Sequence, residues 1–150
     1  MKKILLFILF LNFISFSYSD SYNLSDLAGN QVDYENVTKE NNTIFLMWTT
    51  WCPYCRKEIV NLNKNYMDYK NVSFVIVNLG EKKSKIDQFV KSAKLNPELL
   101  KKFVTDPESN LARKFNIIGI PAYVFLKNGE VIAKYNFLNK EIISEIYENE

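Results

Sequence analysis

The 150-residue sequence contains no histidine. This absence excludes every catalytic pair in which histidine activates serine or cysteine, and every metal site built on imidazole. Cysteine is nearly as scarce, with two residues, Cys52 and Cys55. Two thiolates cannot complete a structural zinc site, so such a site would need carboxylates or a second copy of the chain. We therefore expect no metal and no separate cofactor.

Long apolar runs are also lacking, except at the N-terminus. There, Lys2 and Lys3 precede an almost wholly apolar stretch over residues 4–16, and small serines follow it. This pattern is typical of a secretory signal peptide. We predict a signal peptide over residues 1–19 and one domain over residues 20–150. The alternative is an uncleaved membrane anchor, although the stretch is short against the roughly 20 residues that span a bilayer.

An excess of charge of either sign is missing as well. The chain has 19 basic and 17 acidic residues, and loss of Lys2 and Lys3 with the signal peptide would leave 17 of each. Nucleic-acid affinity depends on a basic face that neutralises phosphates. We therefore expect no nucleic-acid partner. Export, to the periplasm or another extracytoplasmic space, would place the chain where disulfides persist.

The two cysteines form a Cys-x-x-Cys motif within residues 51–55, where a predicted strand gives way to a predicted helix. A disulfide between Cys52 and Cys55 closes a loop so short that it stabilises by only about 2 kcal/mol, against about 3 kcal/mol for fifteen residues. The spacing favours a redox pair that is made and broken. The alternative is an inert structural disulfide.

The remaining pattern predicts one α/β domain. The β-branched and aromatic runs over residues 43–49 and 72–79 are typical of strands that are buried on both faces. Apolar residues between Pro53 and Tyr69 recur at helical spacing, so a helix should connect the two strands in a βαβ unit. Turn and cap residues predict the other elements. These are a loose N-terminal hairpin over 22–37, a helix over 84–95, a short strand over 102–105, a short helix over 109–115, strands over 122–126 and 131–135, and a helix after Asn139.

Three features together resemble the thioredoxin superfamily. They are a Trp-Cys-x-x-Cys motif at a strand-to-helix turn, a βαβ unit, and a Gly-Ile-Pro sequence at residues 119–121 that precedes a hairpin and a helix. Residues 48–52, Glu58 and residues 77–81 make the chain most similar to exported TlpA/ResA-type thiol–disulfide oxidoreductases. The resemblance implies a thioredoxin fold, with a central mixed β-sheet flanked by helices and an N-terminal β-hairpin extension. Leu46 departs from the pattern, because cytosolic thioredoxins carry a buried aspartate there.

Thiol–disulfide exchange requires one thiolate that attacks and a second thiol that resolves the mixed disulfide. The helix N-terminus favours the thiolate of Cys52, so Cys52 is the predicted nucleophile and Cys55 the resolving residue. Glu58 lies one helical turn beyond Cys55. Spacing alone favours a solvated surface carboxylate for Glu58, whereas the resemblance implies an acid that handles the resolving proton.

The resemblance also implies a substrate-binding region. It implies that the Ile120–Pro121 bond is cis and that the backbone of Ile120 pairs with an extended substrate segment. Spacing alone does not decide the isomer, and the alternative is an ordinary trans proline in a loop. Trp51 is expected to be an exposed apolar contact for the partner, and Trp48 a core residue.

Pro53 and Tyr54, between the cysteines, complete the predicted substrate-binding set. Pro53 fits the first turn of a helix, where its missing N–H has no partner to lose. Tyr54 is expected to be exposed and to influence the choice of partner. The Pro-Tyr dipeptide resembles that of glutaredoxins, so the redox potential stays open.

These observations predict an extracytoplasmic oxidoreductase that reduces specific protein disulfides, acts as a monomer and is recharged by a membrane-bound or exported electron donor. One alternative is a DsbA-like thiol oxidant or isomerase. Another is a non-catalytic binding module with a permanent disulfide. A peroxidase is disfavoured because the sequence offers no separate peroxidatic cysteine.

Overall fold

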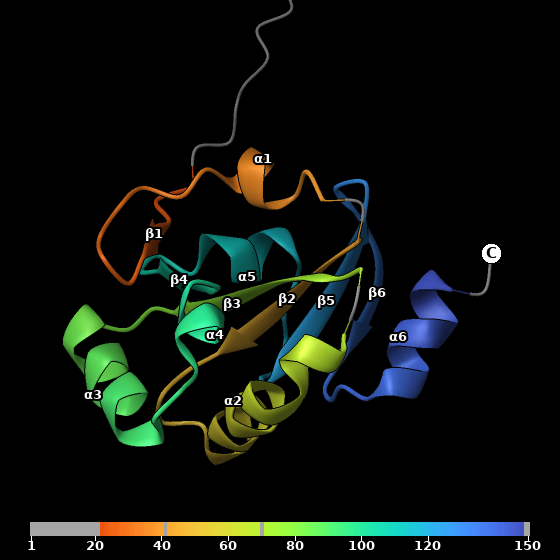
Figure 1. Ribbon diagram of the computed structural model, residues 1–150. Helices are drawn as coiled ribbons and strands as arrows, with labels where there is room; N and C mark the ends of the chain where they lie inside the picture. Colours follow the sequence, from red (N-terminus) through yellow and green to blue (C-terminus); the bar gives the residue numbers. More distant parts are fainter. Residues whose placement is uncertain (1–21, 41, 70, 149–150) are drawn as a thin grey trace, which may run out of the picture.

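The computed structural model describes residues 22–40, 42–69 and 71–148 (Figure 1). The predicted signal peptide over residues 1–19 lies outside this part of the chain and stays a prediction. Across the described ranges, no helix combines the length and the apolar character needed to span a bilayer.

A six-stranded mixed sheet forms the centre of the domain, in the spatial order β1-β4-β3-β2-β5-β6. The central pairs β2–β3 and β3–β4 are parallel, while β1–β4, β2–β5 and β5–β6 are antiparallel. The strands are β1 (Ser25–Asp26), β2 (Asn42–Trp48), β3 (Ser73–Leu79), β4 (Phe103–Asp106), β5 (Ala122–Lys127) and β6 (Glu130–Tyr135). This arrangement confirms the predicted fold class.

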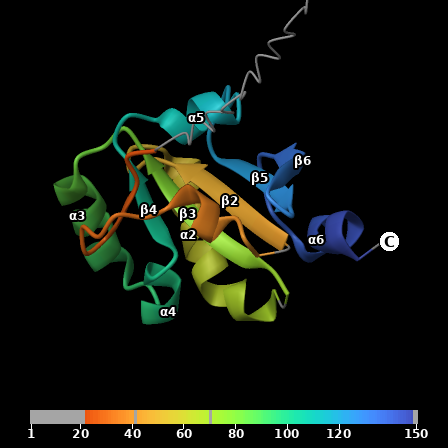
Figure 2. The same ribbon diagram turned by 90° about the horizontal axis from the view of Figure 1, so that it is seen from above.

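Helices cover both faces of the sheet. The elements are α1 (Tyr34–Val37), α2 (Pro53–Asn65), the short 3-10 helix η1 (Tyr66–Asp68), α3 (Lys83–Ala93), α4 (Pro97–Leu100), α5 (Asn110–Lys114) and α6 (Lys140–Tyr147). In Figure 1, α1 and α5 lie on one side of the sheet, and α2 and α4 lie on the other. Figure 2 shows α3 and α6 toward opposite edges, with α2 between them.

The core consists of two apolar clusters, one on each face, because successive side chains of a strand point to opposite sides. One cluster joins Leu46, Trp48 and Tyr123 to both cysteines and to α2. The other joins Phe45 and Met47 to α1, α5 and the N-terminal segment. Strands β2 and β3 are buried on both faces, as their continuous apolar runs predict.

The N-terminal hairpin is shorter than predicted. Ser25 bridges Gln31 across a tight turn, and β1 then pairs with β4 at the edge of the sheet. Residues 34–37 form α1 rather than a second strand, because the Asp33 side chain accepts a hydrogen bond from the Glu35 N–H and caps the helix. The extension to the fold is therefore a hairpin followed by one helical turn.

The segment after α3 contains a short helix, α4, that the sequence did not predict. Lys94 adopts a left-handed conformation and ends α3 at Ala93. The Asn96 side chain accepts from the Glu98 N–H and caps the helix α4, in which Pro97 is the first residue. The Asn-Pro pair therefore serves as the N-cap and the first residue of α4.

Candidate active site

Cys52 and Cys55 form a disulfide at the N-terminus of α2. Cys52 is the N-cap residue, and its Sγ accepts a hydrogen bond from the Cys55 N–H at 3.1 Å. Pro53 follows in the first turn, where a proline fits. Both cysteines are buried. After reduction, the same backbone donors and helix dipole would stabilise a thiolate on Cys52 more than on Cys55.

A loop far away in sequence packs against this disulfide. The Ile120–Pro121 peptide bond is cis, as the resemblance implied. The carbonyl oxygen of Ile120 lies 4.0 Å from Cys52 Sγ. Asn136 fixes the other side of the loop, since its Nδ2 donates to the Pro121 carbonyl at 2.9 Å. The contact of Asn136 was not predicted, because nothing local in the sequence marks it.

Large apolar side chains are exposed beside the cysteines in the chain and on the proline loop. Trp51 is 68% exposed and Tyr54 is 75% exposed, as predicted for both. Ile118 of the proline loop is 97% exposed and was not predicted. Trp48 is fully buried against Phe89 and Phe103, as expected of a core residue. The site therefore offers a hydrophobic surface beside a recessed sulfur.

The loop before Trp51 is held by Glu81. One carboxylate oxygen accepts from the Thr50 N–H at 2.5 Å and from Asn78 Nδ2 at 2.8 Å, and the other accepts from Thr50 Oγ1 at 2.6 Å. Burial raises the pKa of Glu81, but the hydrogen bonds from Thr50 and Asn78 outweigh burial and hold the pKa below its ordinary value. The sequence singled out Glu81 within a motif but did not predict this contact.

Glu58 is half-buried on α2, and its Oε2 accepts a hydrogen bond from the hydroxyl of Tyr123 at 2.7 Å. Tyr123, in β5, is only 1% exposed. Burial, together with the neighbouring Glu58 carboxylate, raises the pKa of Tyr123 far above its usual range. Tyr123 was not predicted as a site residue. The one local signal for it is a hydroxyl-bearing aromatic in an otherwise apolar strand, two residues after Pro121.

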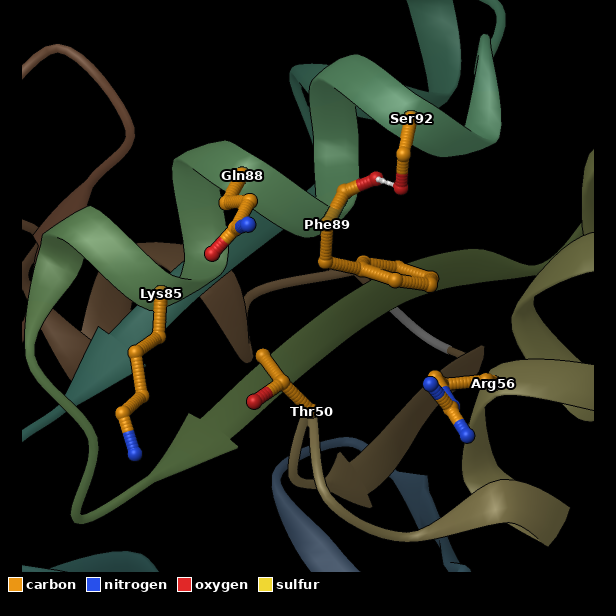
Figure 3. A pocket seen from close by; sticks show the side chains of 6 residues that line it. All are labelled: Thr50, Arg56, Lys85, Gln88, Phe89 and Ser92. Carbon is orange, nitrogen blue, oxygen red and sulfur yellow. Dashed lines mark hydrogen bonds between the residues drawn. The ribbon is translucent and has the colours of Figure 1, made fainter.

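Two cavities flank α2. The first, of about 370 Å³, lies between α2 and α3, and Figure 3 shows Arg56 and Lys85 on either side of Thr50. Gln88, Phe89 and Ser92 complete its lining. The second, of about 480 Å³, lies between α2 and the start of α6 and is lined by Glu58, Asn61, Leu62, Asn65, Asp68, Tyr69, Tyr123, Leu138, Asn139 and Lys140. Glu58 thus faces, from the helix that carries the disulfide, a cavity that opens to solvent.

Comparison with protein families gives a match over residues 18–141 to the model described as the AhpC/TSA family. Sporulation thiol-disulfide oxidoreductase A of Bacillus subtilis is 27% identical over 114 residues, which cover 72% of this chain and 66% of that protein. Thiol-disulfide oxidoreductase ResA of Geobacillus kaustophilus is 29% identical over 119 residues, which cover 77% and 65% respectively. The chain thus spans slightly less than two thirds of the length of these relatives.

Solved structures give the same fold. The crystal structure of StoA from Bacillus subtilis is 27% identical and has a TM-score of 0.66, with 83% of this chain and 93% of that one covered. A secreted disulfide oxidoreductase of Mycobacterium tuberculosis also has a TM-score of 0.66, at 20% identity and with 83% and 92% covered. At that identity, the second similarity shows the fold alone.

Proposed function

The chain belongs to the AhpC/TSA family, and from that premise we propose that it is an extracytoplasmic thiol–disulfide oxidoreductase that reduces specific protein disulfides through Cys52 and Cys55. One observation carries the proposal. The Cys52 sulfur caps α2, receives a backbone N–H and lies against the Ile120 carbonyl. The names of the relatives, which are thiol-disulfide oxidoreductases, support the same chemistry.

The first step is attack by the Cys52 thiolate on one sulfur of a client disulfide. The client S–S bond breaks, and the displaced client sulfur leaves as a thiolate that takes a proton from water. A mixed disulfide between Cys52 and the client remains. The helix N-terminus assists because it stabilises the thiolate of Cys52 before the attack.

The second step is resolution by Cys55. Its thiol passes a proton to Glu58, and the resulting thiolate attacks Cys52 Sγ. The second client sulfur leaves and is protonated, so the client gains two electrons and two protons. The protein is left with the Cys52–Cys55 disulfide that the structure contains. A dithiol of an exported or membrane-bound donor then restores the reduced form by the reverse exchange.

The client is proposed to dock as an extended segment. Trp51, Tyr54 and Ile118 supply apolar contacts around the sulfur, and the backbone of Ile120 supplies polar ones beside Pro121. A segment that pairs with backbone brings its disulfide to Cys52 whatever its own side chains are. The apolar neighbours would then select among clients.

Export and a monomeric state complete the proposal. The export signal pattern over residues 1–19 supports an extracytoplasmic location. The proposed reaction needs one copy of the chain, because both cysteines, Glu58 and the Ile120–Pro121 loop belong to the same domain.

The test is to mix the reduced protein with a disulfide-bonded protein such as insulin and follow free thiols on both. We expect one client disulfide to be reduced for each Cys52–Cys55 disulfide formed, and no reaction with Cys52→Ser. Failure of the reduced protein to react with any disulfide-bonded protein would overturn the proposal. The reduction potential gives the direction: a value near about −270 mV fits a reductant, and one near about −120 mV fits a DsbA-like oxidant.

A further inference from the structure

A buried hydroxyl lies against the carboxylate of Glu58. Tyr123 stands in β5 directly across from Leu46 of β2, and its ring belongs to the same apolar cluster as Cys55. Tyr123 is 1% exposed, and its hydroxyl donates a hydrogen bond to Glu58 Oε2 at 2.7 Å. A buried tyrosine hydroxyl requires such a partner. The hydrogen bond connects the apolar cluster that contains Cys55 to the carboxylate of Glu58 on α2.

The contact restricts the position of Glu58. A glutamate side chain has three rotatable bonds and, at a half-buried position, several rotamers to choose from. The ring of Tyr123 is fixed by the core, so its hydroxyl provides a rigid point to which one carboxylate oxygen is tied. Among the described residues, Glu58 Oε1 accepts no hydrogen bond. One oxygen is therefore held by protein and the other remains available to an incoming proton.

The tyrosine stays a donor under ordinary conditions. Burial and the Glu58 carboxylate both raise the pKa of Tyr123, so the hydroxyl keeps its proton. The charged neighbours on the same cavity wall do not replace it. Lys140 pairs with Asp68 at 3.2 Å rather than with Glu58.

We propose that Tyr123 is a positioning residue for the resolving step: its hydroxyl holds Glu58 Oε2 so that Oε1 can take the proton of Cys55. The inference rests on the proposed function and adds to it a residue on another strand. Tyr123 exchanges no proton itself in this role. Its effect should therefore appear in resolution and not in the first attack by Cys52.

The test uses an aromatic disulfide, dithiobis(2-nitrobenzoate). It releases one coloured thiolate when Cys52 attacks it and a second when Cys55 resolves the mixed disulfide. With fully reduced protein, we expect Tyr123→Phe to leave the first phase unchanged and to slow the second at least about tenfold, the low end of the loss expected for one hydrogen bond to a charged group. Equal slowing of both phases, or no slowing of either, would overturn the inference.

Coupling between the two residues separates positioning from a general structural effect. In a Glu58→Ala background, Tyr123→Phe should cause no further slowing of the second phase, because the group that it positions is gone. A second slowing of the same size would contradict the inference.

Tyr147→Phe is the matched control. It also deletes a largely buried tyrosine hydroxyl, but that hydroxyl donates to the carbonyls of Thr43 and Leu126, at 3.0 Å each, away from Glu58. We expect it to lower stability and leave both phases unchanged. If Tyr147→Phe slowed the second phase as much as Tyr123→Phe does, the inference would be wrong.

Failure of the inference can be distinguished from failure of the proposed function. If reduced wild-type protein releases no coloured thiolate and reduces no protein disulfide, the proposed function falls and the inference falls with it. If exchange is normal and Glu58→Ala slows resolution while Tyr123→Phe does not, only the inference is overturned.

Discussion

At the residue scale, the loop before Trp51 depends on a single carboxylate. Glu81 receives two hydrogen bonds from Thr50 and one from Asn78, which ties the approach to Cys52 to the end of β3. Backbone donors at such a loop would otherwise need water or another acceptor. The position of Trp51 and Cys52 therefore rests partly on a charge that acid can remove.

We expect the stabilisation by Glu81 to depend on pH. The folded state holds the pKa of Glu81 below its ordinary 4.5, so the stabilisation is complete above about pH 4.5 and is lost as the pH falls through the lower folded value. Urea unfolding should show wild type more stable than Glu81→Gln at neutral pH, by on the order of 1 kcal/mol, with a gap that closes in acid.

Glu145→Gln is the control for this measurement. Glu145 is exposed on α6 and makes no hydrogen bond to the described residues, so its removal should leave the pH dependence of stability as in wild type. A gap between wild type and Glu81→Gln that stayed constant from neutral pH down through acid would contradict the account of Glu81.

The sequence predicted some residues of the site and not others, for a physical reason. Cys52, Cys55 and the exposed Trp51 are visible because their neighbours along the chain define a strand-to-helix turn. Tyr123 and Asn136 act through contacts with residues far away in sequence or on another element, Glu58 and Pro121. No local spacing encodes such a contact, so only the folded chain reveals it.

At the scale of elements, caps decide where the helices begin. The α6 helix begins after Asn139, whose side chain accepts from the Ile142 N–H at 2.8 Å. The sequence predicted this cap, and the structure confirms it. The sequence analysis did not predict the caps of α1 and α4. Each of these helices is a single turn of four residues, which is too short to show the apolar periodicity of a helix.

We expect loss of the α6 cap to destabilise the protein modestly. Asn139→Ala should lower the free energy of unfolding by about 1 kcal/mol, since it leaves a helix N–H without its side-chain acceptor. Thermal unfolding would register this as a drop of roughly 2 to 4 °C for a chain of this size. Asn139→Asp keeps an acceptor and should remain close to wild type. Equal losses for the two variants would show that capping is not the cause.

At the scale of the whole molecule, the sheet is buried on both faces and holds the redox pair at one end of its central strand. The fold class followed from the sequence because the strands β2, β3 and β5 are nearly continuous apolar runs of strand length. The pairing of β1 with β4 could not be predicted, because β1 has two residues and so shows no alternation of apolar and polar side chains. Stability should therefore reside in the two apolar clusters and little in the disulfide.

The double variant Cys52→Ala/Cys55→Ala tests that distribution. We expect it to unfold cooperatively, with a loss of about 2 kcal/mol from the crosslink, because the closed loop is so short. Urea unfolding followed by circular dichroism measures both quantities. A variant without a cooperative transition would mean that the disulfide is a structural requirement.

The central claim is that Cys52 attacks protein disulfides and Cys55 completes the exchange. The most direct measurement is the covalent trapping of a disulfide-bonded protein by Cys55→Ser, analysed by mass spectrometry without reductant. The account predicts an adduct through Cys52 that reductant releases, and none with Cys52→Ser. No adduct with Cys55→Ser, or an equal adduct with Cys52→Ser, would contradict it.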